Sequence, residues 1–413
     1  MDADLIPTSW EKRGNIITVV GVGGGGNNAV SYMYKLGLKD VDFVVCNTDT
    51  QALQKSPVPT KLQIGPILTK GLGAGTDYTV GRQAAEESLE EISRLFEGDT
   101  QMVFVTCGMG GGTGTGAAPL VAKTAKEQGK LTVGVVTVPF RDEGKEALYR
   151  AVEGIKELSK HVDSILVIDN QKLYQLYGKM NIFTAFNKAD EVLATAVKSI
   201  AEIITSSGYI NVDFADVKKV MKNSGVAIMG IGEAEGQDRA TKAVEQALNS
   251  PLLNDLNLRS VKNALINITA SCDEEHGISM EELSQIMDFT SQYTGATINF
   301  KRGIVFDETM GDKISVTIIA TGFEMWQLPV IDENEVNRGN RIDVKYGQDL
   351  FRNRKKGRPV APEGGKQLNK QRVSGIPALI VDDVRLIQAL EEEPAYTRRE
   401  RMLNVKENPV SEA

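Results

Sequence analysis

The sequence predicts an α/β protein in which a parallel sheet, covered by helices on both faces, is followed by a long helix and a smaller α+β domain. Three observations support this prediction. Short apolar runs rich in Val and Ile alternate with amphipathic segments from residue 15 to about residue 169. One apolar stripe with helical spacing follows over residues 182–207. Runs that alternate apolar and polar residues then extend to residue 322.

Five apolar runs in the first region are its predicted strands: NIITVVGVG, VDFVVCNTD, QMVFVTCG, LTVGVVTVPF and SILVIDN. Strands that are apolar throughout, with helices between them, are typical of a parallel sheet buried on both faces. In such sheets, ligands bind at the carboxyl ends of the strands. The glycine clusters and the NTD triplet at residues 47–49 fall at these ends, so we expect the binding site there.

The long helix has one apolar face, formed by residues that recur at intervals of three and four: Leu193, Val197, Ile200 and Ile204. Gly208 is expected to end this helix. Beyond it, the runs ALINITAS, ATINFKRGIVFD and KISVTIIATGF alternate apolar and polar residues as half-buried strands do. Residues 208–322 are therefore predicted to form the α+β domain, with one solvated sheet face.

The two ends of the chain are predicted to be disordered. Residues 1–13 precede the first strand, and residues 323–388 are rich in Gly, Pro, Asn and Gln with few apolar residues. Between residues 338 and 372 there are eleven Lys and Arg but three Asp and Glu, which indicates a basic linker. Residues 389–405 regain some apolar spacing, as expected of a short peptide that becomes ordered on a partner.

Composition limits the classes of function. The 413 residues are 41% hydrophobic and 25% charged, typical of a soluble globular protein, and the net charge of −8 argues against a general nucleic-acid binder. Neither a signal peptide nor an apolar membrane span is predicted. The chain has two histidines, which makes a histidine metal site improbable. Its three cysteines, Cys46, Cys107 and Cys272, are far apart in the sequence, which indicates reduced, buried thiols in a cytoplasm.

Three glycine-rich segments are the main functional signal, at residues 23–26, 71–75 and 110–116. Together with Gly21, the first segment fits G-x-G-x-x-G at Gly21, Gly23 and Gly26, with Asp49 downstream, which leaves a dinucleotide-binding enzyme open. A Walker P-loop is excluded, because no Gly-Lys pair is followed by Ser or Thr. One such segment alone is explained by a tight turn. Three of them near strand ends predict backbone N–H groups that bind a chain of phosphates.

The motifs GVGGGGNNAV, NTDTQAL, TKGLGAG, GMGGGTGTGAAP, PFRDEGK, ELSKHVDS and NVDFADV resemble those of the tubulin/FtsZ superfamily, and in combination those of the bacterial FtsZ family. The resemblance covers about residues 14–322. It implies a Rossmann-like GTP-binding domain over residues 14–181, a central helix, and a C-terminal domain carrying a catalytic loop. It also implies a GTPase that polymerises head to tail into the cell-division ring, in the cytoplasm beneath the inner membrane.

The resemblance also implies roles for single residues in binding GTP or GDP and Mg²⁺. The phosphates would meet Gly24, Gly25, Gly26, Asn27, Asn28, Gly111, Gly112, Thr113, Gly114, Thr115 and Gly116. Ala74 and Gly75 would sense the γ-phosphate, while Asn47 and Asp49 would lie near a Mg²⁺ held by phosphates and water. Family members usually have an Arg that contacts the sugar or a phosphate at the position where this chain has Ala147, and Arg150 nearby is a candidate substitute for this Arg.

The remaining nucleotide contacts concern the sugar and the base. By the same resemblance, Glu143 would bind the ribose, Asp190 would accept hydrogen bonds from guanine, and Phe186 would stack on the base. Two ordinary explanations stay open: Asp190 as a solvated helix acid and Phe186 as a core aromatic.

The catalytic residues implied by the resemblance are Asn211, Asp213 and Asp216, acting on the GTP of the neighbouring subunit. A helix of about 25 residues spans roughly 38 Å, which would hold them far from their own phosphates. The ordinary alternative is a helix N-cap followed by a first-turn acid.

The terminal peptide, with Pro394, Ala395, Tyr396, Arg398 and Arg399, loosely resembles the family peptide that binds membrane tethers such as the actin-like FtsA. The ordinary alternative is that this segment is a charged, solvated chain end that binds no partner. No nucleic-acid partner and no transmembrane segment are expected. Two other functions stay open from the sequence: a Rossmann-type NAD-dependent oxidoreductase, and a tubulin-like regulator of assembly that does not hydrolyse GTP.

Overall fold

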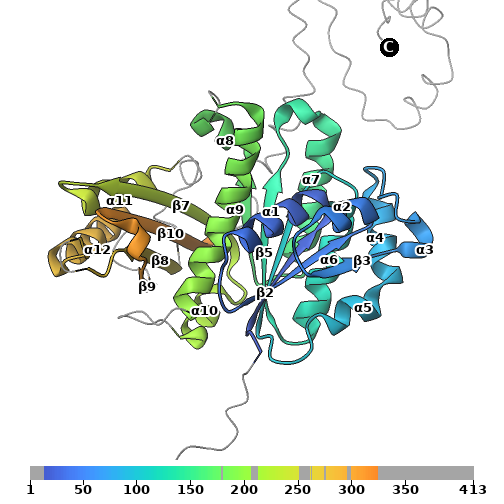
Figure 1. Cartoon of the computed structure of the whole chain (residues 1–413), viewed down its shortest axis with the longest axis horizontal. Helices are drawn as coiled ribbons and strands as arrows, with labels where there is room; N and C mark the ends of the chain where they lie inside the picture. The colour runs from blue at the N-terminus through green and yellow to red at the C-terminus, as the bar shows by residue number, and fades with distance from the viewer. Residues whose placement is uncertain are drawn as a thin grey trace, which may run out of the picture. The chain divides into compact units, whose positions relative to one another are not determined.

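A single sheet runs through the part of the chain that this computed structural model describes, which is residues 14–177, 180–205, 213–250, 261, 263–273, 276–294 and 299–323 (Figure 1). Within these residues the sheet is 10-stranded, in the order β3-β2-β1-β4-β5-β6-β7-β10-β8-β9. The predicted N-terminal extension, basic linker and terminal peptide lie outside the described residues, apart from Phe323.

The first strands along the chain are β1 (Ile17–Val22), β2 (Val41–Asn47), β3 (Thr60–Gln63), β4 (Met102–Gly108), β5 (Leu131–Val138) and β6 (Ser164–Asp169). All their pairings are parallel, and five of them coincide with the five apolar runs, so the predicted parallel sheet is confirmed. The edge strand β3 is missing from the prediction because it is short and mostly polar, and exposed or half-buried.

The helices that connect these strands are α1 (Gly23–Lys35), α2 (Thr50–Lys55), α3 (Pro66–Thr69), α4 (Tyr78–Glu87), α5 (Leu89–Arg94), α6 (Thr113–Glu127), α7 (Lys145–Ser159) and α8 (Asn170–Tyr177), with a 3₁₀ turn η1 (Arg141–Glu143). They cover both faces of the sheet. In β1, Ile17 and Val19 face a core shared with α1, whereas Val20 and Val22 face one shared with α6 and α7.

The second half contains α9 (Ile182–Thr205), α10 (Phe214–Met221), β7 (Gly225–Glu235), α11 (Arg239–Leu248), β8 (Asn263–Ala270), α12 (Met280–Thr294), β9 (Asn299–Phe306), a 3₁₀ turn η3 (Glu308–Met310) and β10 (Lys313–Phe323). β10 is antiparallel to β7 and β8, and β9 is parallel to β8. β7 pairs in parallel with β6, which makes one sheet of both halves.

The long helix α9 belongs to both halves of the described chain. Its predicted apolar stripe is confirmed: Leu193, Val197 and Ile200 are buried. They share one core with residues of β1 and α1 on one side and with Leu265 and Ile319 of the second half on the other. The expected helix end at Gly208 lies outside the described residues. α9 therefore fixes the position of the second half against the parallel sheet.

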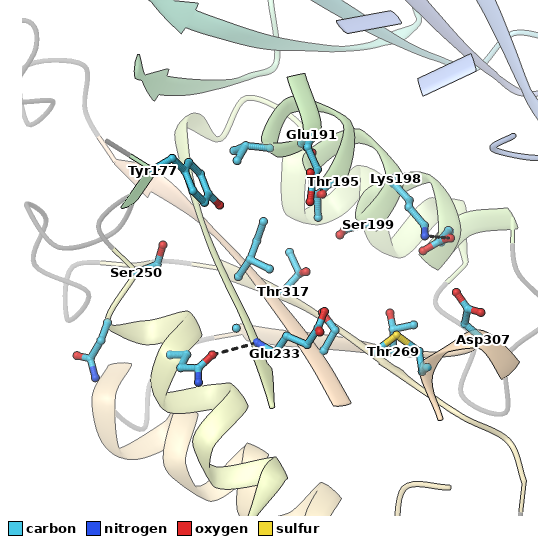
Figure 2. Close-up of a pocket in the computed structure, with 18 residues that line it drawn as sticks. Tyr177, Glu191, Thr195, Lys198, Ser199, Glu233, Ser250, Thr269, Asp307 and Thr317 are labelled. Atoms are coloured by element: carbon cyan, nitrogen blue, oxygen red, sulfur yellow. Dashed lines mark hydrogen bonds and ion pairs between the residues drawn. The ribbon is translucent and has the colours of Figure 1, made fainter. Parts of the chain in front are cut away.

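The predicted solvated face of the second half is wrong for β8 and β10, which are buried along nearly their whole length. Apolar side chains on one face pack against α11 and α12. The polar side chains that alternate with them, such as Thr269 and Thr317, line a cleft of about 630 Å³ beside α9 (Figure 2). α9 thus covers the sheet face that the alternating pattern assigns to solvent. Glu202 of α9 also lines this cleft, and burial there raises the pKa of its carboxyl.

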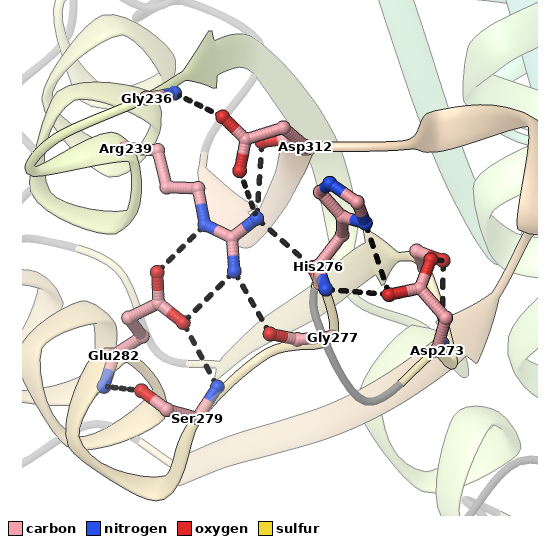
Figure 3. A network of polar contacts seen from close by, with 9 residues as sticks. Gly236, Arg239, Asp273, His276, Gly277, Ser279, Glu282 and Asp312 are labelled. Atoms are coloured by element: carbon pink, nitrogen blue, oxygen red, sulfur yellow. Dashed lines mark hydrogen bonds and ion pairs between the residues drawn. The ribbon is translucent and has the colours of Figure 1, made fainter.

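A buried arginine joins separate segments of the second half (Figure 3). The guanidinium of Arg239 donates to both carboxylate oxygens of Glu282, at 2.7 and 3.2 Å, and to the carboxylate of Asp312 at 3.0 Å. It also donates to the backbone carbonyls of His276 and Gly277 at 2.9 and 2.8 Å. These contacts connect α11, α12 and the turn before β10, and the hydrogen bond with the Glu282 carboxylate, helped by the charge of Asp312, raises the pKa of Arg239.

We expect Arg239→Ala to lower the free energy of unfolding by roughly 3 kcal/mol, because it removes the charge that pairs with Glu282 and the donor to three backbone carbonyls, those of His276, Gly277 and Asp312. Urea unfolding followed by circular dichroism measures the change. Lys242→Ala is the matched control on α11, since Lys242 is exposed and contacts the carbonyl of Gln237. Equal midpoints for the two variants would contradict the prediction.

Candidate nucleotide-binding site

The three glycine-rich segments come together at the carboxyl ends of β1 and β4. The segment after β1 begins α1, and the segment after β4 begins α6. A Cβ placed on Gly23 would lie 2.7 Å from the backbone N of Gly114, and one placed on Gly112 would lie 2.9 Å from the Cβ of Ala74. The three loops therefore touch one another, and at Gly23 and Gly112 only glycine leaves room for this approach.

The loops present unpaired backbone donors. Within the described residues, the N–H groups of Gly111, Gly112 and Thr113 make no hydrogen bond of ordinary geometry. α6 begins at Thr113, within the third glycine-rich segment. The first-turn N–H groups of α1 and α6 and the helix dipoles behind them favour an anion in front of the loops.

The turn after β2 is attached to the other loops by side chains. The hydroxyls of Thr48 and Thr113 lie 2.7 Å apart, which connects β2 with the start of α6. Asp49 caps α2 by accepting from the backbone N of Gln51 at 2.8 Å, and it forms a β-bridge with Leu72. The buried Thr48 is absent from the predicted site, because one Thr between two polar residues carries no distinctive sequence signal.

Of the two asparagines after β1, one faces the protein and the other faces solvent. In the amide orientation that satisfies its neighbours, Asn27 donates to the carbonyls of Gly21, Gly23 and Cys46 and accepts from Asn47 at 3.1 Å. Asn28 is exposed. Asn27 and Asn47 thus hold the loops together from below, and Asn28, with the neighbouring Gly24 and Gly25, is the part that faces outward.

The last residues of the third segment face inward. The Thr115 hydroxyl is buried and accepts from the backbone N of Gly110 at 2.9 Å. A Cβ on Gly116 would overlap the carbonyl of Tyr78, so this glycine is required by the packing of α4 on α6. The sequence signal of Thr115 and Gly116 therefore reflects the packing behind the loop. Gly111 is exposed and Thr113 half-buried, and these two residues form the outer edge of the loop, whereas Gly112 between them is buried against Ala74.

The residues predicted for the sugar and the base lie on other elements. Glu143 is exposed in η1, where its carboxylate accepts from the backbone N of Phe140 at 2.8 Å. Asp190 lies on α9, and burial raises its pKa to about 7. It is therefore not a solvated helix acid. The side chain of Phe186 is outside the described residues, and Ala147 is buried.

The predicted catalytic acids lie beyond the C-terminal end of α9, the end away from α8. In Figure 1, α8 is at one end of this helix and α10, which follows the acids' loop, is at the other. Asp213 is the N-cap of α10 and accepts from the backbone N of Asp216 at 2.7 Å, so the capping interpretation is confirmed. Asp216 forms an ion pair with Lys301 of β9. Asn211 lies outside the described residues.

Two cysteines lie under the loops. Cys46 and Cys107 are fully buried, and burial raises the pKa of each thiol to about 12, which makes them unsuitable as nucleophiles. They are core side chains, as predicted. Cys272 is exposed, so the same prediction is wrong for it, because it follows β8 in a surface loop.

Among the residues that the structure describes, no group of three or more His, Cys, Asp or Glu side chains is arranged to hold a metal ion. None of the helices in that part of the chain combines the length and apolarity needed to cross a bilayer.

Comparison with known proteins identifies this arrangement. Residues 16–178 match the Tubulin/FtsZ family, GTPase domain, and residues 225–324 match the FtsZ family, C-terminal domain. The chain is 50% identical over 308 residues to "Cell division protein FtsZ" of Pseudomonas aeruginosa, covering 74% of this chain and 77% of that protein. It is 41% identical over 423 residues to the Porphyromonas gingivalis protein of the same name, covering 99% and 91%.

Solved structures give the same result. "FtsZ dimer, empty" of M. jannaschii superposes with a TM-score of 0.70 at 44% identity, over 74% of this chain and 88% of that one. CetZ2 of Haloferax volcanii, at 20% identity and a TM-score of 0.67, shares the fold over 78% of this chain and 99% of its own. A GTPase family excludes both the NAD-dependent oxidoreductase and the non-hydrolysing regulator. The chain belongs to the bacterial FtsZ family of tubulin-like GTPases.

Proposed function

We propose that this GTPase polymerises head to tail into the filaments of the cell-division ring, and that each GTP is hydrolysed with help from the next subunit. The observation that carries this proposal is the distance between two halves of one site. The open phosphate-binding loops and the carboxylates of Asp213 and Asp216 belong to opposite ends of α9, a helix of 24 residues and so roughly 36 Å. One chain cannot bring both halves to the same phosphate.

In this proposal the glycine loops bind the phosphates through Gly24, Gly25, Asn28 and the outer edge formed by Gly111 and Thr113. Ala74 and Gly75 contact the γ-phosphate. Their loop touches Gly112 and is connected through Leu72 to Asp49, so loss of the γ-phosphate would be transmitted between loops. Glu143 binds the ribose hydroxyls, and Phe186 stacks on the base.

Mg²⁺ would be held mainly by phosphate oxygens and water, with Asp49 and Asn47 as its nearest protein partners. Both residues fit this role because they supply oxygen donors beside the loops. When bound, the metal neutralises charge that develops on the phosphates. Asp49 already accepts from two backbone N–H groups of α2, so its carboxylate is held in place before any ligand binds.

The nucleotide end of the chain also carries exposed apolar side chains suited to contact with another subunit. Ile67 and Leu72, on either side of the second glycine segment's start, are 82% and 86% exposed, and Leu68 is exposed beside them. Exposed apolar groups of this kind mark interfaces. If the acids of a second copy cover this end, the contact is heterologous and repeats into an open filament.

We expect the GTPase rate per subunit to rise steeply above a threshold protein concentration, because a lone subunit lacks the acids of its neighbour. Phosphate release measured over a concentration series tests this, with 90° light scattering after addition of GTP, ATP or GDP as the parallel assay of assembly. Only GTP should produce scattering. A rate per subunit that is independent of concentration would show a self-contained active site.

The terminal peptide at residues 389–405 is proposed to bind a membrane tether such as the actin-like FtsA, which would locate the filaments beneath the inner membrane. Pelleting of full-length and tail-deleted protein with liposomes, with and without a purified tether, tests this. Tether-dependent pelleting lost on deletion supports the proposal. Pelleting without the tether would instead indicate that the basic linker binds anionic lipid directly.

A further inference from the structure

Arg150 contacts the phosphate-binding loop from behind. Its Nε donates to the backbone carbonyl of Gly110 at 2.9 Å, and its side chain is 23% exposed. Its other neighbour is Glu146, whose side chain is 95% exposed at 3.7 Å, a distance and exposure at which an ion pair contributes little. The contact with the loop is therefore the main interaction of this guanidinium.

Gly110 is fixed on both sides of its Cα. Its N–H donates to the Thr115 hydroxyl, and its carbonyl accepts from Arg150. Its φ of +96° lies in the region that favours glycine, and a Cβ would approach the carbonyl of Ala147 to 2.8 Å. The residue is held in a conformation that only glycine adopts easily, with α7 directly behind it.

The direction of one carbonyl determines the direction of the next N–H. A trans peptide is planar, so the C=O of Gly110 and the N–H of Gly111 point in opposite directions. Because Arg150 on α7 attracts the carbonyl, the Gly111 N–H points away from α7. This N–H makes no hydrogen bond of ordinary geometry within the described residues, and Gly111 itself is exposed, with nothing within 4 Å of a Cβ placed on it.

We propose that Arg150 is a positioning residue for nucleotide binding, which orients the Gly111 N–H toward a bound phosphate. The inference rests on the proposed use of this loop for GTP phosphates. Two adjacent glycines make the 110–111 peptide free to rotate by about half a turn, because neither has a Cβ to resist it. Without Arg150, part of the population would present the carbonyl oxygen, which repels a phosphate.

The position of Arg150 on α7 suits this role. Ala147 is the residue of α7 that lies against Gly110, but its methyl side chain has no hydrogen-bond donor. Side chains in a helix lean toward the N-terminus, and residues three apart share a face. Arg150 therefore reaches the turn that contains Ala147 and supplies the donor from there. Its charge also adds positive potential under the loop.

The test uses Arg150→Met, which keeps much of the packing but removes the donor and the charge, and Arg150→Lys, which restores a charged donor. Affinity for Mg-GDP is measured with a fluorescent GDP analogue at concentrations where no filaments form, and guanosine is measured by competition. We expect Arg150→Met to weaken GDP binding roughly tenfold or more and to leave guanosine binding unchanged. Arg150→Lys should recover part of the loss.

Glu146→Gln is the matched control, since it removes only the weak ion pair, and GDP affinity should stay at the wild-type value. Equal GDP affinity in Arg150→Met and wild type would overturn the inference. So would equal losses for GDP and guanosine, which would indicate a role in folding. If the wild-type chain binds neither ligand, it is the proposed nucleotide site that fails.

Discussion

Asp213→Asn and Asp216→Asn should each lower the GTPase rate by roughly 10²–10³-fold while leaving GTP affinity unchanged. The reason is that these carboxylates would act on the GTP of a neighbour and lie far from their own nucleotide. Asn is chosen because it caps a helix about as well as Asp, so the N-cap of α10 is retained. Phosphate release and equilibrium GTP binding are the two measurements.

Lys218→Ala is the matched control on α10, because Lys218 lies on the same helix and contacts the ring of Phe214, not the acids. It should keep the wild-type rate. If Asp213→Asn and Asp216→Asn also keep that rate, the acids are only structural, as an N-cap and an ion pair with Lys301. If the two variants lose GTP binding together with activity, the substitutions disturb the fold and do not report on catalysis.

A mixture of two inactive variants tests action between subunits. Asp213→Asn is expected to bind GTP but to lack one of the two acids that its neighbour needs. Asp190→Ala is expected to supply both acids but to bind GTP too weakly to hydrolyse it. Where the two meet in the correct order, one complete site forms, so the mixture should hydrolyse GTP well above the sum of its components. A mixture no more active than its components would indicate that each chain uses its own acids.

The second large effect is expected at Asp190. Asp190→Ala should weaken GTP binding by roughly 10³-fold, because it removes the acceptor for two guanine N–H groups. ATP binding, weak in the wild type, should change little, since adenine presents neither group. Titration calorimetry with both nucleotides measures the ratio. Equal losses for GTP and ATP would mean that Asp190 supports the pocket without reading the base.

The raised pKa of Asp190 makes this contact dependent on pH. Burial moves the pKa to about 7, so the protonated form dominates at lower pH and loses its capacity to accept two hydrogen bonds. GTP affinity should therefore fall as the pH decreases through 7, by at most tenfold per unit. Asp190→Asn provides the baseline, since titration of the nucleotide phosphates is common to both proteins. Parallel pH profiles would contradict the assignment.

The stability of the nucleotide-free chain should depend on pH in the opposite sense: it should decrease as the pH rises through 7. The folded state raises the pKa of Asp190 above its unfolded value of about 4 and so favours the neutral form. The stabilisation from binding this proton is complete below pH 4 and is lost as the pH rises through 7. At pH 8, Asp190→Asn should therefore unfold at a higher urea concentration than the wild type.

The sequence predicts elements well where one physical signal dominates. The five apolar strands and the stripe of α9 are correct, because complete burial leaves little choice of residue type. β3 carries no such signal at a polar sheet edge, and β7 is absent from the prediction as a separate strand. Residues 113–116 belong to a glycine-rich segment in the sequence, yet they form the first turn of α6, although such residues favour loops in isolation.

Within the candidate site, the residue types that bind phosphate are visible in the sequence, but their directions are not. The glycine motifs identify all three loops and, through resemblance, the family. They do not reveal that Asn27 and Thr115 turn inward, that Gly116 serves helix packing, or that Arg150 contacts Gly110 from another helix. Each of these depends on contacts between segments distant in the chain.

The sequence by itself thus determines that this chain is a tubulin-like GTPase with three glycine loops, an acid on a long helix and two acids beyond it. Glycines and buried strands are specified locally, by backbone conformation and by periodicity. The tertiary structure alone decides which N–H groups face outward and which sheet face α9 covers. The separation of the acids from the loops is already expected from the length of the long helix, whereas the directions of N–H groups and sheet faces arise only when separate elements pack.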